Sequence, residues 1–344
     1  MKRTTIKDVA ARAGVSAATV SRVFSSEPSV APAIAEKVRQ AADALNYRPS
    51  VMARSLTSAK TNLVALVVGR LHNPFDARLV EQLSERLQQS GRRLLLVPAD
   101  YGANDPAAMI ALDYQVDAVI VAAGHLSKES ADRFSQLGVP VLLYGRTLDA
   151  AGVDCIVADN IGAAKLIGEL FRKLGLKHAA FVRHVRETFS DSEREAGFRE
   201  GLGPDITLDI IRCTKATGRE VALTALMGPN RPQGMFCAND VLAFGVLEAA
   251  VQSGLNVPQD IAVVGFDDTD MASSPFFNLT TLHQSPHDIA DWIVSRIAER
   301  LTNPDVQVVT KRMPSLLKLR GTTPSQPIIG GISAIRPSEG NPHD

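Results

Sequence analysis

The sequence predicts a small all-α head followed by a larger α/β body made of two parallel-sheet subdomains. Residues 6–23 hold two short apolar helical patterns separated by a glycine. From Leu63 onward, short apolar runs alternate with helical patterns, which is typical of βαβ units. Residues 1–60 hold ten Lys and Arg against four Asp and Glu, a net charge of +6. Because the whole chain is formally neutral, the remaining residues carry −6, and this asymmetry indicates a polyanion-binding head.

The head pattern predicts a helix-turn-helix. Ile6, Val9, Ala10 and Ala13 form one apolar face, and Gly14 allows the positive φ that ends a helix. Ser16 is expected to cap a second helix, and we predict that residues 16–24 are presented to a DNA major groove. The turn pattern alone also fits an ordinary corner between two helices. A third helix is expected from about Pro32 to Leu45.

Composition restricts the protein class. The chain contains no run of about 18 apolar residues, so no transmembrane helix is expected. Its first residues, Met1 to Thr5, show no signal-peptide pattern. Cys155, Cys213 and Cys237 are few and widely spaced, which favours a reducing cytoplasm over a disulfide framework or a zinc site.

Several motifs resemble the LacI/GalR family of transcriptional regulators, and the resemblance covers residues 4 to about 323. The motifs are Thr5-Ile6-Lys7-Asp8-Val9-Ala10, Gly14-Val15-Ser16, Thr19-Val20-Ser21-Arg22-Val23, Leu45-Asn46-Tyr47-Arg48-Pro49-Ser50 and Ala53-Arg54-Ser55-Leu56. The resemblance implies a body of the periplasmic-binding-protein-like fold with a ligand between its two lobes. It also implies a hinge helix that pairs with its twin in the minor groove, where Leu56 would enter the central base step.

The hinge prediction also has a physical basis. A segment of about eight residues is too short to be a stable isolated helix, so it would become ordered only against its twin and DNA. Leu56 on an otherwise polar segment suits a minor-groove wedge, although a plain interdomain linker remains an alternative. The predicted DNA contacts are Thr5, Ser16, Ala17, Ala18, Thr19, Ser21, Arg22, Tyr47, Ala53 and Leu56.

We expect four regions along the chain. Residues 1–48 are predicted to form the DNA-binding domain, and 49–61 the hinge helix and linker. Residues 62–323 are predicted to form the effector-binding and dimerisation domain, with crossovers between lobes near 158–162, 282–286 and 310–314. Residues 324–344 are rich in Pro, Gly and Ser and lack heptads, so we expect a disordered tail.

Candidate ligand contacts follow the strands, since open parallel sheets bind ligands at the carboxyl ends of their strands. Arg194, Asn239 and Asp267 lie in segments that match ligand-contacting motifs of the family. Phe75 is placed to stack on a sugar ring, and Asp76 stands where many relatives have a second aromatic residue. The predicted ligand set is Phe75, Asp76, Ser190, Arg194, Phe236, Asn239 and Asp267.

More ordinary roles remain open for some of these residues. Asp240 is expected to cap the helix that begins at residue 241, and Arg194 also suits a surface ion pair. Arg183, His184 and Arg186 form a basic cluster. Such a cluster is typical of a solvated loop, but it leaves an acidic effector possible.

The sequence shows no nucleophile elbow, Walker loop or metal-ligand motif, so we predict neither an enzyme nor a cofactor or metal. The predicted function is a cytoplasmic, nucleoid-associated homodimeric repressor of a palindromic operator. Its operator affinity would be altered by a sugar or sugar derivative bound between the lobes. One alternative is an activator or global regulator controlled by a partner protein or corepressor. Another, a transport-type binding protein, is disfavoured by the basic head.

Overall fold

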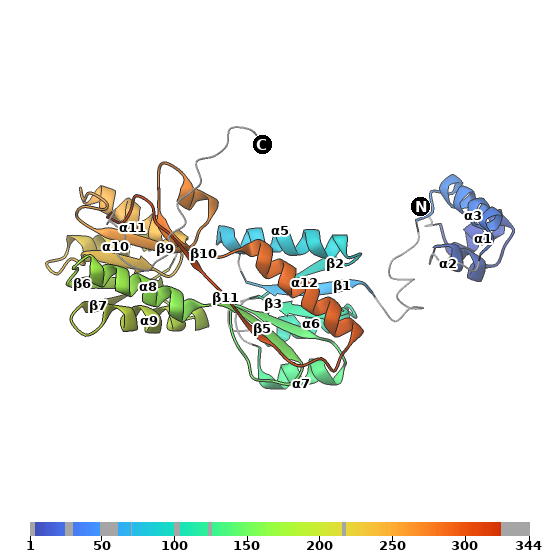
Figure 1. Cartoon of the computed structure of the whole chain (residues 1–344). Coiled ribbons are helices and arrows are strands. Elements are labelled where there is room, and N and C mark those ends of the chain that lie inside the picture. Colours follow the sequence, from blue (N-terminus) through green and yellow to red (C-terminus); the bar gives the residue numbers. More distant parts are fainter. Residues whose placement is uncertain are drawn as a thin grey trace.

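The computed structural model describes residues 4–24, 30–48, 61–69, 71–99, 104–122, 126–214 and 218–324. They form a three-helix head and a body of two lobes, each built on its own sheet (Figure 1). The predicted fold class is therefore confirmed. Most of the predicted hinge segment, residues 49–60, and all but the first residue of the predicted tail lie outside the described residues.

The head is a helix-turn-helix followed by a third helix. Its helices are α1 (Ile6–Ala13), α2 (Ala17–Phe24) and α3 (Pro32–Ala44). α1 begins with a capping box between Thr5 and Asp8 and ends at Gly14, whose φ is 66°. The Ser16 hydroxyl accepts a hydrogen bond from the Thr19 backbone N–H over 3.1 Å, which is the predicted cap of α2.

The first lobe is a six-stranded parallel sheet covered by helices on both faces. Its sheet order is β11-β5-β4-β3-β1-β2. The strands are β1 (Leu63–Val68), β2 (Arg93–Pro98), β3 (Ala118–Val121), β4 (Val141–Tyr144), β5 (Val153–Ala158) and β11 (Thr310–Met313). The helices are α5 (Pro74–Gln89), α6 (Asn104–Asp113), α7 (Lys128–Gln136) and α12 (Pro286–Thr302). α5 and α12 pack on one face, and the residues of the opposite face form a second core cluster.

The second lobe repeats this arrangement with the order β12-β10-β9-β8-β6-β7, in which β12 alone is antiparallel. Its strands are β6 (His178–His184), β7 (Thr207–Cys213), β8 (Gly234–Cys237), β9 (Ala262–Asp267), β10 (Thr280–His283) and β12 (Leu316–Lys318). Its helices are α8 (Asn160–Lys173), α9 (Phe189–Leu202), α10 (Gly218–Met227), α11 (Asp240–Gln252) and the 3₁₀ helix η1 (Asp270–Ser273).

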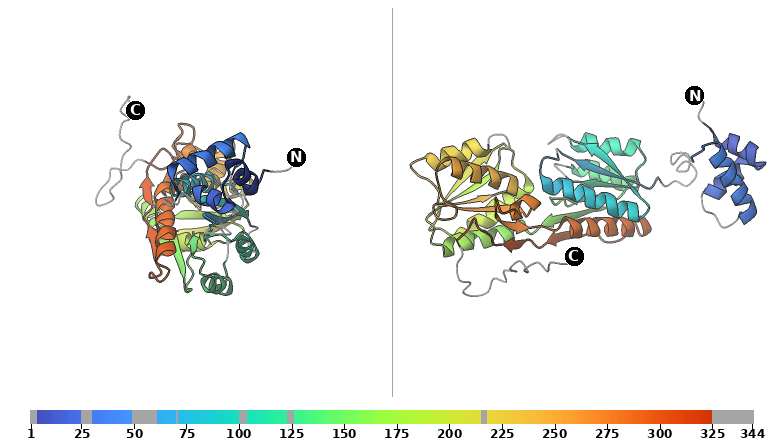
Figure 2. Two further views of the ribbon diagram at one scale, coloured as in Figure 1. Left: turned by 90° about the vertical axis from the view of Figure 1, so that its right-hand side faces the viewer. Right: turned by 90° about the horizontal axis from the view of Figure 1, so that it is seen from above.

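Three segments join the two sheets. The first segment runs from β5 of the first sheet to α8 of the second lobe. The second runs from β10 of the second sheet to α12 and β11 of the first lobe, and the third runs from β11 to β12 of the second sheet. Figures 1 and 2 show the lobes end to end, with the orange to red α12 and β11 running along one side. α12 is fixed to the first lobe by the buried carboxylate of Asp154, which binds Arg296 over 2.9 Å and Arg300 over 2.7 Å.

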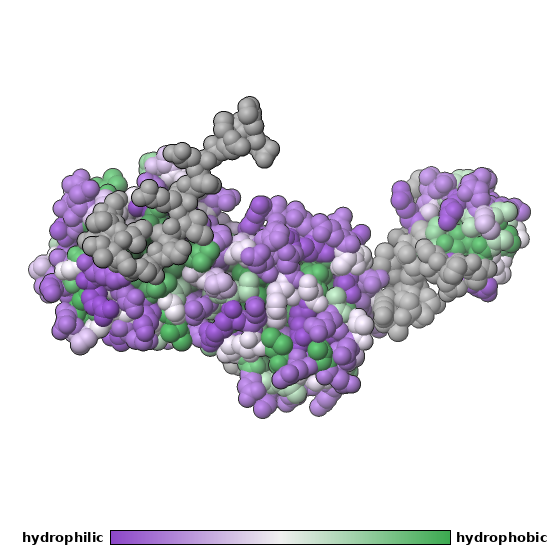
Figure 3. Space-filling model, viewed as in Figure 1, coloured by the Kyte–Doolittle hydropathy of each residue, from purple (hydrophilic) through white to green (hydrophobic). Residues whose placement is uncertain are grey.

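The surface of the body drawn in Figure 3 is mostly hydrophilic, with small hydrophobic areas on both lobes. None of the helices in the described ranges is both long and apolar enough to span a bilayer.

Candidate effector cleft and DNA-binding helix

The predicted DNA-reading helix is α2, and its outward side chains are small or polar. Ala18 and Arg22 are exposed, whereas Val20 and Val23 are buried in the head core. This separation is what a helix needs if it is to present one face to a groove. Thr5 and Ser16 are exposed and serve as helix caps, while Ala17, Thr19 and Ser21 are partly buried.

Tyr47 has a packing role in addition to its predicted DNA contact. Its ring is partly buried and lies 6.0 Å from the ring of Phe24, at the end of α2. Two predicted DNA contacts, Ala53 and Leu56, fall outside the described residues.

The cleft between the lobes is organised around Asp267, at the carboxyl end of β9. The backbone turns there with φ of 114° at Asp267 and 56° at Asp268, a strained conformation for residues with side chains. Asp240 stabilises the turn from behind, because its carboxylate accepts hydrogen bonds from the backbone and side chain of Thr269 and from the Thr281 hydroxyl. The result is a carboxylate held at the sheet edge that faces the other lobe.

Asp267 is bound from two directions. Asn73, in the first lobe, donates to its Oδ2 over 2.7 Å, and Gln284 donates to its Oδ1 over 2.8 Å. Only 4% of Asp267 is exposed, and burial raises its pKa, an effect that nearby Arg194 opposes. Asp267 is therefore an acceptor whose hydrogen bonds span both lobes.

Arg194 enters the cleft from α9. Close packing positions this helix, since a Cβ on Gly197 would lie 2.2 Å from the backbone oxygen of Ile161 in α8. The Arg194 guanidinium is 3.4 Å from the centre of the Phe266 ring, donates to Asn160 over 2.9 Å and also donates to the Ala238 carbonyl. Arg194 is thus a buried, oriented cation beside Asp267, and within the described ranges of the chain it forms no surface ion pair.

Two further predicted residues, Ser190 and Asp76, lie at the cleft. Ser190 donates from its hydroxyl to the Gly145 carbonyl of the first lobe over 3.2 Å. Asp76 lies in the first turn of α5, and burial raises its pKa to about 7, with a further increase from nearby Asp267 and an opposing effect of His184. The structure therefore brings Asp76, Ser190, Arg194 and Asp267 to one cleft.

The structure gives the two predicted aromatic contacts packing positions. Phe236 is fully buried, with its ring centre 5.1 Å from that of Phe198 and 5.3 Å from that of Phe181. Phe75 is 4% exposed and belongs to the core of the first lobe. Both rings therefore pack inside their own lobes, and we take neither as a stacking surface for a ligand.

The Asn239–Asp240 pair also departs from expectation. Asn239 is the N-cap of α11, and its Oδ1 accepts a hydrogen bond from the Leu242 backbone N–H over 2.9 Å. The cap predicted for Asp240 is therefore wrong, because Asp240 is completely buried beneath the Asp267 turn instead. Of these two neighbouring residues, Asn239 caps the helix and Asp240 stabilises the turn at Asp267.

Sequence reasoning missed Asn73, Tyr144 and Gln284. Tyr144 ends β4 close to Asp76 and Asp267, and burial raises the pKa of its hydroxyl well above the usual value. Its position at the carboxyl end of a strand was the available signal. Gln284 follows β10, a strand that the sequence pattern did not predict, so no signal pointed to it.

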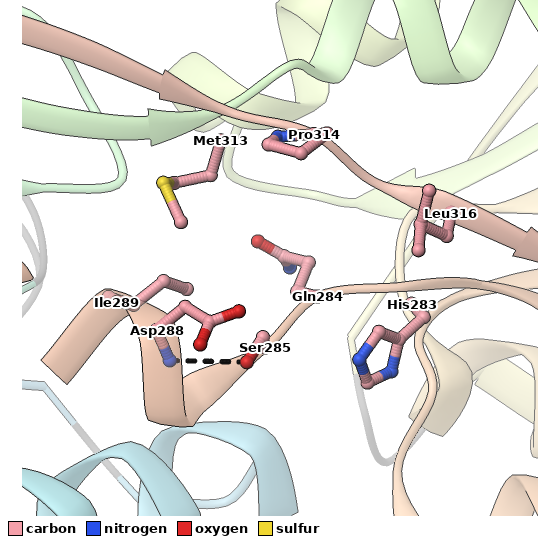
Figure 4. A pocket seen from close by; sticks show the side chains of 8 residues that line it. All are labelled: His283, Gln284, Ser285, Asp288, Ile289, Met313, Pro314 and Leu316. Carbon is pink, nitrogen blue, oxygen red and sulfur yellow. Dashed lines mark hydrogen bonds between the residues drawn. The ribbon is translucent and has the colours of Figure 1, made fainter. Parts of the chain in front are cut away.

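A pocket lies beside the crossover segments, and neither Asp76 nor Asp267 lines it. Figure 4 shows its lining, in which the Gln284 side chain points toward the pocket centre; the other lining residues are His283, Ser285, Asp288, Ile289, Met313, Pro314 and Leu316. Gln284 links this pocket to the cleft, because its side chain also donates a hydrogen bond to Asp267.

Comparisons with known proteins agree with this architecture. Residues 5–50 match the family of bacterial regulatory proteins, lacI family, and residues 169–323 match a periplasmic binding protein-like domain. The chain is 30% identical over 293 residues to the HTH-type transcriptional regulator DegA of Bacillus subtilis (strain 168), covering 82% of this chain and 87% of that protein. It is 29% identical over 333 residues to the ribose operon repressor of Escherichia coli (strain K12), covering 92% and 99%.

A solved structure extends the likeness to the whole arrangement. The lac repressor dimer bound to operator and the anti-inducer ONPF matches with a TM-score of 0.81 and 26% identity, over 94% of this chain and all of that chain. The head, the two-lobed body and these relatives lead to one conclusion: the chain belongs to the LacI/GalR family of transcriptional regulators.

Proposed function

We propose that the chain is a homodimeric repressor whose operator affinity is set by a small polyhydroxyl effector bound between the two lobes. The observation that carries this proposal is the meeting of Arg194, Asp267 and Asn73 at one cleft, with contributions from both lobes. A ligand that bonds these groups would change how the lobes are held together. Because the head is attached to the first lobe, a change in the position of that lobe would be transmitted to the head.

The donors and acceptors of the cleft suit a sugar or sugar derivative. A hydroxyl both donates and accepts, so neighbouring hydroxyls can donate to Asp267 and Asp76 and accept from Arg194. The relatives fit this class, since one is named for the ribose operon and the matched lac repressor holds the ligand ONPF. We propose Asp76, Ser190, Arg194 and Asp267 as ligand contacts, together with Asn73, Tyr144 and Gln284.

On the DNA side, we propose that α2 of each protomer reads one half of a palindromic operator. The predicted contacts in the head are Ala17, Ala18, Thr19, Ser21 and Arg22, supported at the edges by Thr5, Ser16 and Tyr47. Ala53 and Leu56 are proposed for the minor groove, with Leu56 as the wedge in the central step. This arrangement needs no catalytic group, and we infer that the protein is a cytoplasmic regulator and not an enzyme.

A selected operator tests the proposal with the full chain. The operator is first obtained by in vitro selection, and compounds that raise the melting temperature of the protein are then added to a DNA-binding titration. We expect at least one polyhydroxyl compound to change operator affinity, and the direction of the change separates an inducer from a corepressor. The same titration with Arg194→Ala should retain operator affinity and lose the response. A variant that melts cooperatively and still responds would remove Arg194 from the site.

A further inference from the structure

Asp76 differs from Asp8 and Asp191, which occupy the same position in two other helices. In α1 and α9 the third residue, Asp8 or Asp191, accepts a hydrogen bond from the backbone N–H of the N-cap threonine. In α5 the third residue is Asp76, and its carboxylate has no hydrogen bond or ion pair to any residue that the structure describes. A partly buried carboxyl group that lacks a partner is costly to the fold.

The surroundings of Asp76 increase this cost. Asn73, the N-cap of the same helix, binds Asp267 over 2.7 Å, which brings Asp267 near the first turn of α5 that holds Asp76. At this position Asp267 repels the ionised form of Asp76, while the His184 ring opposes that effect. Arg194, the buried cation of the cleft, is already held by Asn160, the Ala238 carbonyl and the Phe266 ring. Asp191 and Asp240 accept hydrogen bonds from Thr188 and Thr269. Asp267 is bonded by Asn73 and Gln284 and lies near Arg194, so Asp76 is the cleft carboxylate that has no partner among the described residues.

The nearby basic cluster does not offset this charge. Arg183 forms ion pairs with Glu187 over 2.9 Å and with Glu195 over 3.5 Å. His184 lies 3.7 Å from Asp191. Two of the three basic side chains therefore face carboxylates of their own lobe, and the cluster gives no support to an acidic effector.

We propose that the effector carries a protonated amine, which binds between Asp76 of the first lobe and Asp267 of the second. This inference rests on the proposed function and specifies its ligand class as an amino sugar or a similar amine-bearing polyol. An ammonium group has three N–H donors and no acceptor, which suits a site that offers carboxylate oxygens from both sides. Arg194 compensates only Asp267, so the charge of the ammonium group would compensate Asp76, which neutral hydroxyls would leave ionised near Asp267.

Three matched compound series provide the test, with glucose, galactose and mannose as parents. Each parent is compared with its 2-amino, 2-acetamido and 6-phosphate derivatives by calorimetric titration of the full-length dimer at pH 7, where the 2-amino group is mostly protonated. In at least one series we expect the amine to bind about tenfold or more tightly than the parent, the difference that one charge-assisted hydrogen bond supplies. The acetamido derivative, which keeps the nitrogen but loses its charge, should not show this gain.

Variants assign the preference to the carboxylate. Asp76→Asn keeps the shape of the side chain and should reduce the ratio of amine to parent affinity about tenfold. Asp205→Asn is the control, since Asp205 is exposed at the start of β7, the opposite end of the sheet from the cleft. It should leave the ratio unchanged.

The outcomes separate this inference from the proposed function. A parent sugar or a phosphate that binds as tightly as the amine, or an Asp76→Asn variant with an unchanged ratio, overturns the amine and leaves the polyhydroxyl cleft standing. If no member of any series binds, the amino-sugar inference fails; if in addition no polyhydroxyl compound in the melting-temperature screen changes operator affinity, the proposed function fails as well.

Discussion

Asn73 of the first lobe and Asp267 of the second are joined by a hydrogen bond of 2.7 Å, although 194 positions separate them in the chain. The same Asn73 side chain caps α5, because its Oδ1 accepts a hydrogen bond from the Phe75 backbone N–H over 3.1 Å. One amide therefore uses its acceptor within its own lobe and its donor across the cleft. Any ligand that takes over Asp267 must compete with this contact, which couples binding to the position of the lobes.

Asn73→Asp should separate the lobes while keeping the helix cap. Asp caps helices as well as Asn does, but it replaces the amide donor by a carboxylate that faces Asp267. We expect a loss of roughly 1–3 kcal/mol of interlobe stabilisation, as for a buried acceptor left unpaired, and a larger radius of gyration in small-angle scattering at pH 8. Asn239→Asp, the matching cap of α11, should leave the scattering unchanged. Identical curves for the two variants would show that the contact does not hold the lobes.

Asp76 should make the stability of the body depend on pH. Its pKa is raised from 3.8 to about 7, so the folded state holds a proton that the unfolded chain releases over this interval. The contribution of Asp76 to the free energy of unfolding is therefore greatest below pH 4. It falls as the pH rises to about 7 and is constant above that pH. For Asp76 we expect a loss of roughly 2–4 kcal/mol, measured by urea unfolding followed by Trp292 fluorescence.

Asp76→Asn should remove this part of the pH dependence without removing all of it. Burial also raises the pKa of Asp240 to about 7, again with a contribution from Asp267, and that group remains in the variant. The slope of stability against pH should therefore decrease and keep the same sign. A slope equal to that of the unchanged protein would mean that Asp76 ionises normally.

The sequence predicted the fold because the alternation of apolar runs and helical patterns is local information. The sequence pattern did not predict β10, β11, β12 or α12. The side chains of β11 and β12 are mainly exposed or partly buried, so these two strands lack an apolar run. These elements belong to the crossover region, where strand pairing depends on segments far apart in the chain. Periodicity carries no information on such pairing.

The ends of the strands predicted where the site lies, but the sequence did not predict which way each side chain points. Phe236 precedes the end of β8, and alternation along the strand determines whether its ring faces a helix or the cleft. Here it faces Phe198 of α9. Asn73 was missed because its contact with Asp267 depends on how the lobes meet. Contacts between the lobes depend on the tertiary structure, and no local sequence pattern predicts them.

Arg22 should distinguish the operator from random DNA. It is exposed on α2 and long enough for two hydrogen bonds to a guanine edge, so Arg22→Ala should cost ~1–3 kcal/mol on the operator and little on random sequence. Fluorescence anisotropy with both DNAs measures the two losses. Arg39→Ala, which removes the same charge from the exposed face of α3, should not change the ratio of the two affinities. Equal losses with Arg22→Ala would make that residue a phosphate contact.

Phe276 marks the surface that we predict for the dimer interface of the second lobe. It is 87% exposed, and its ring packs edge-on against Phe277, which in turn stacks on Phe244 of α11 with ring centres 4.3 Å apart. An exposed aromatic ring supported by two others is an expensive surface for a monomer and a typical anchor in an interface. Because regulators of this family act as dimers, we expect Phe276 to be covered by the partner subunit.

Phe276→Asp should therefore weaken the dimer and, through it, operator binding. Replacing an interface anchor by a charge should raise the dimer dissociation constant by about 30-fold or more, corresponding to roughly 2 kcal/mol. Sedimentation velocity over a dilution series measures this constant. Operator binding should then depend more steeply on protein concentration, because two heads are needed for the two half-sites. Val251→Asp is the control, since Val251 is 78% exposed and has no aromatic neighbour in the described structure. A dissociation constant that is unchanged in Phe276→Asp would show that the interface lies elsewhere.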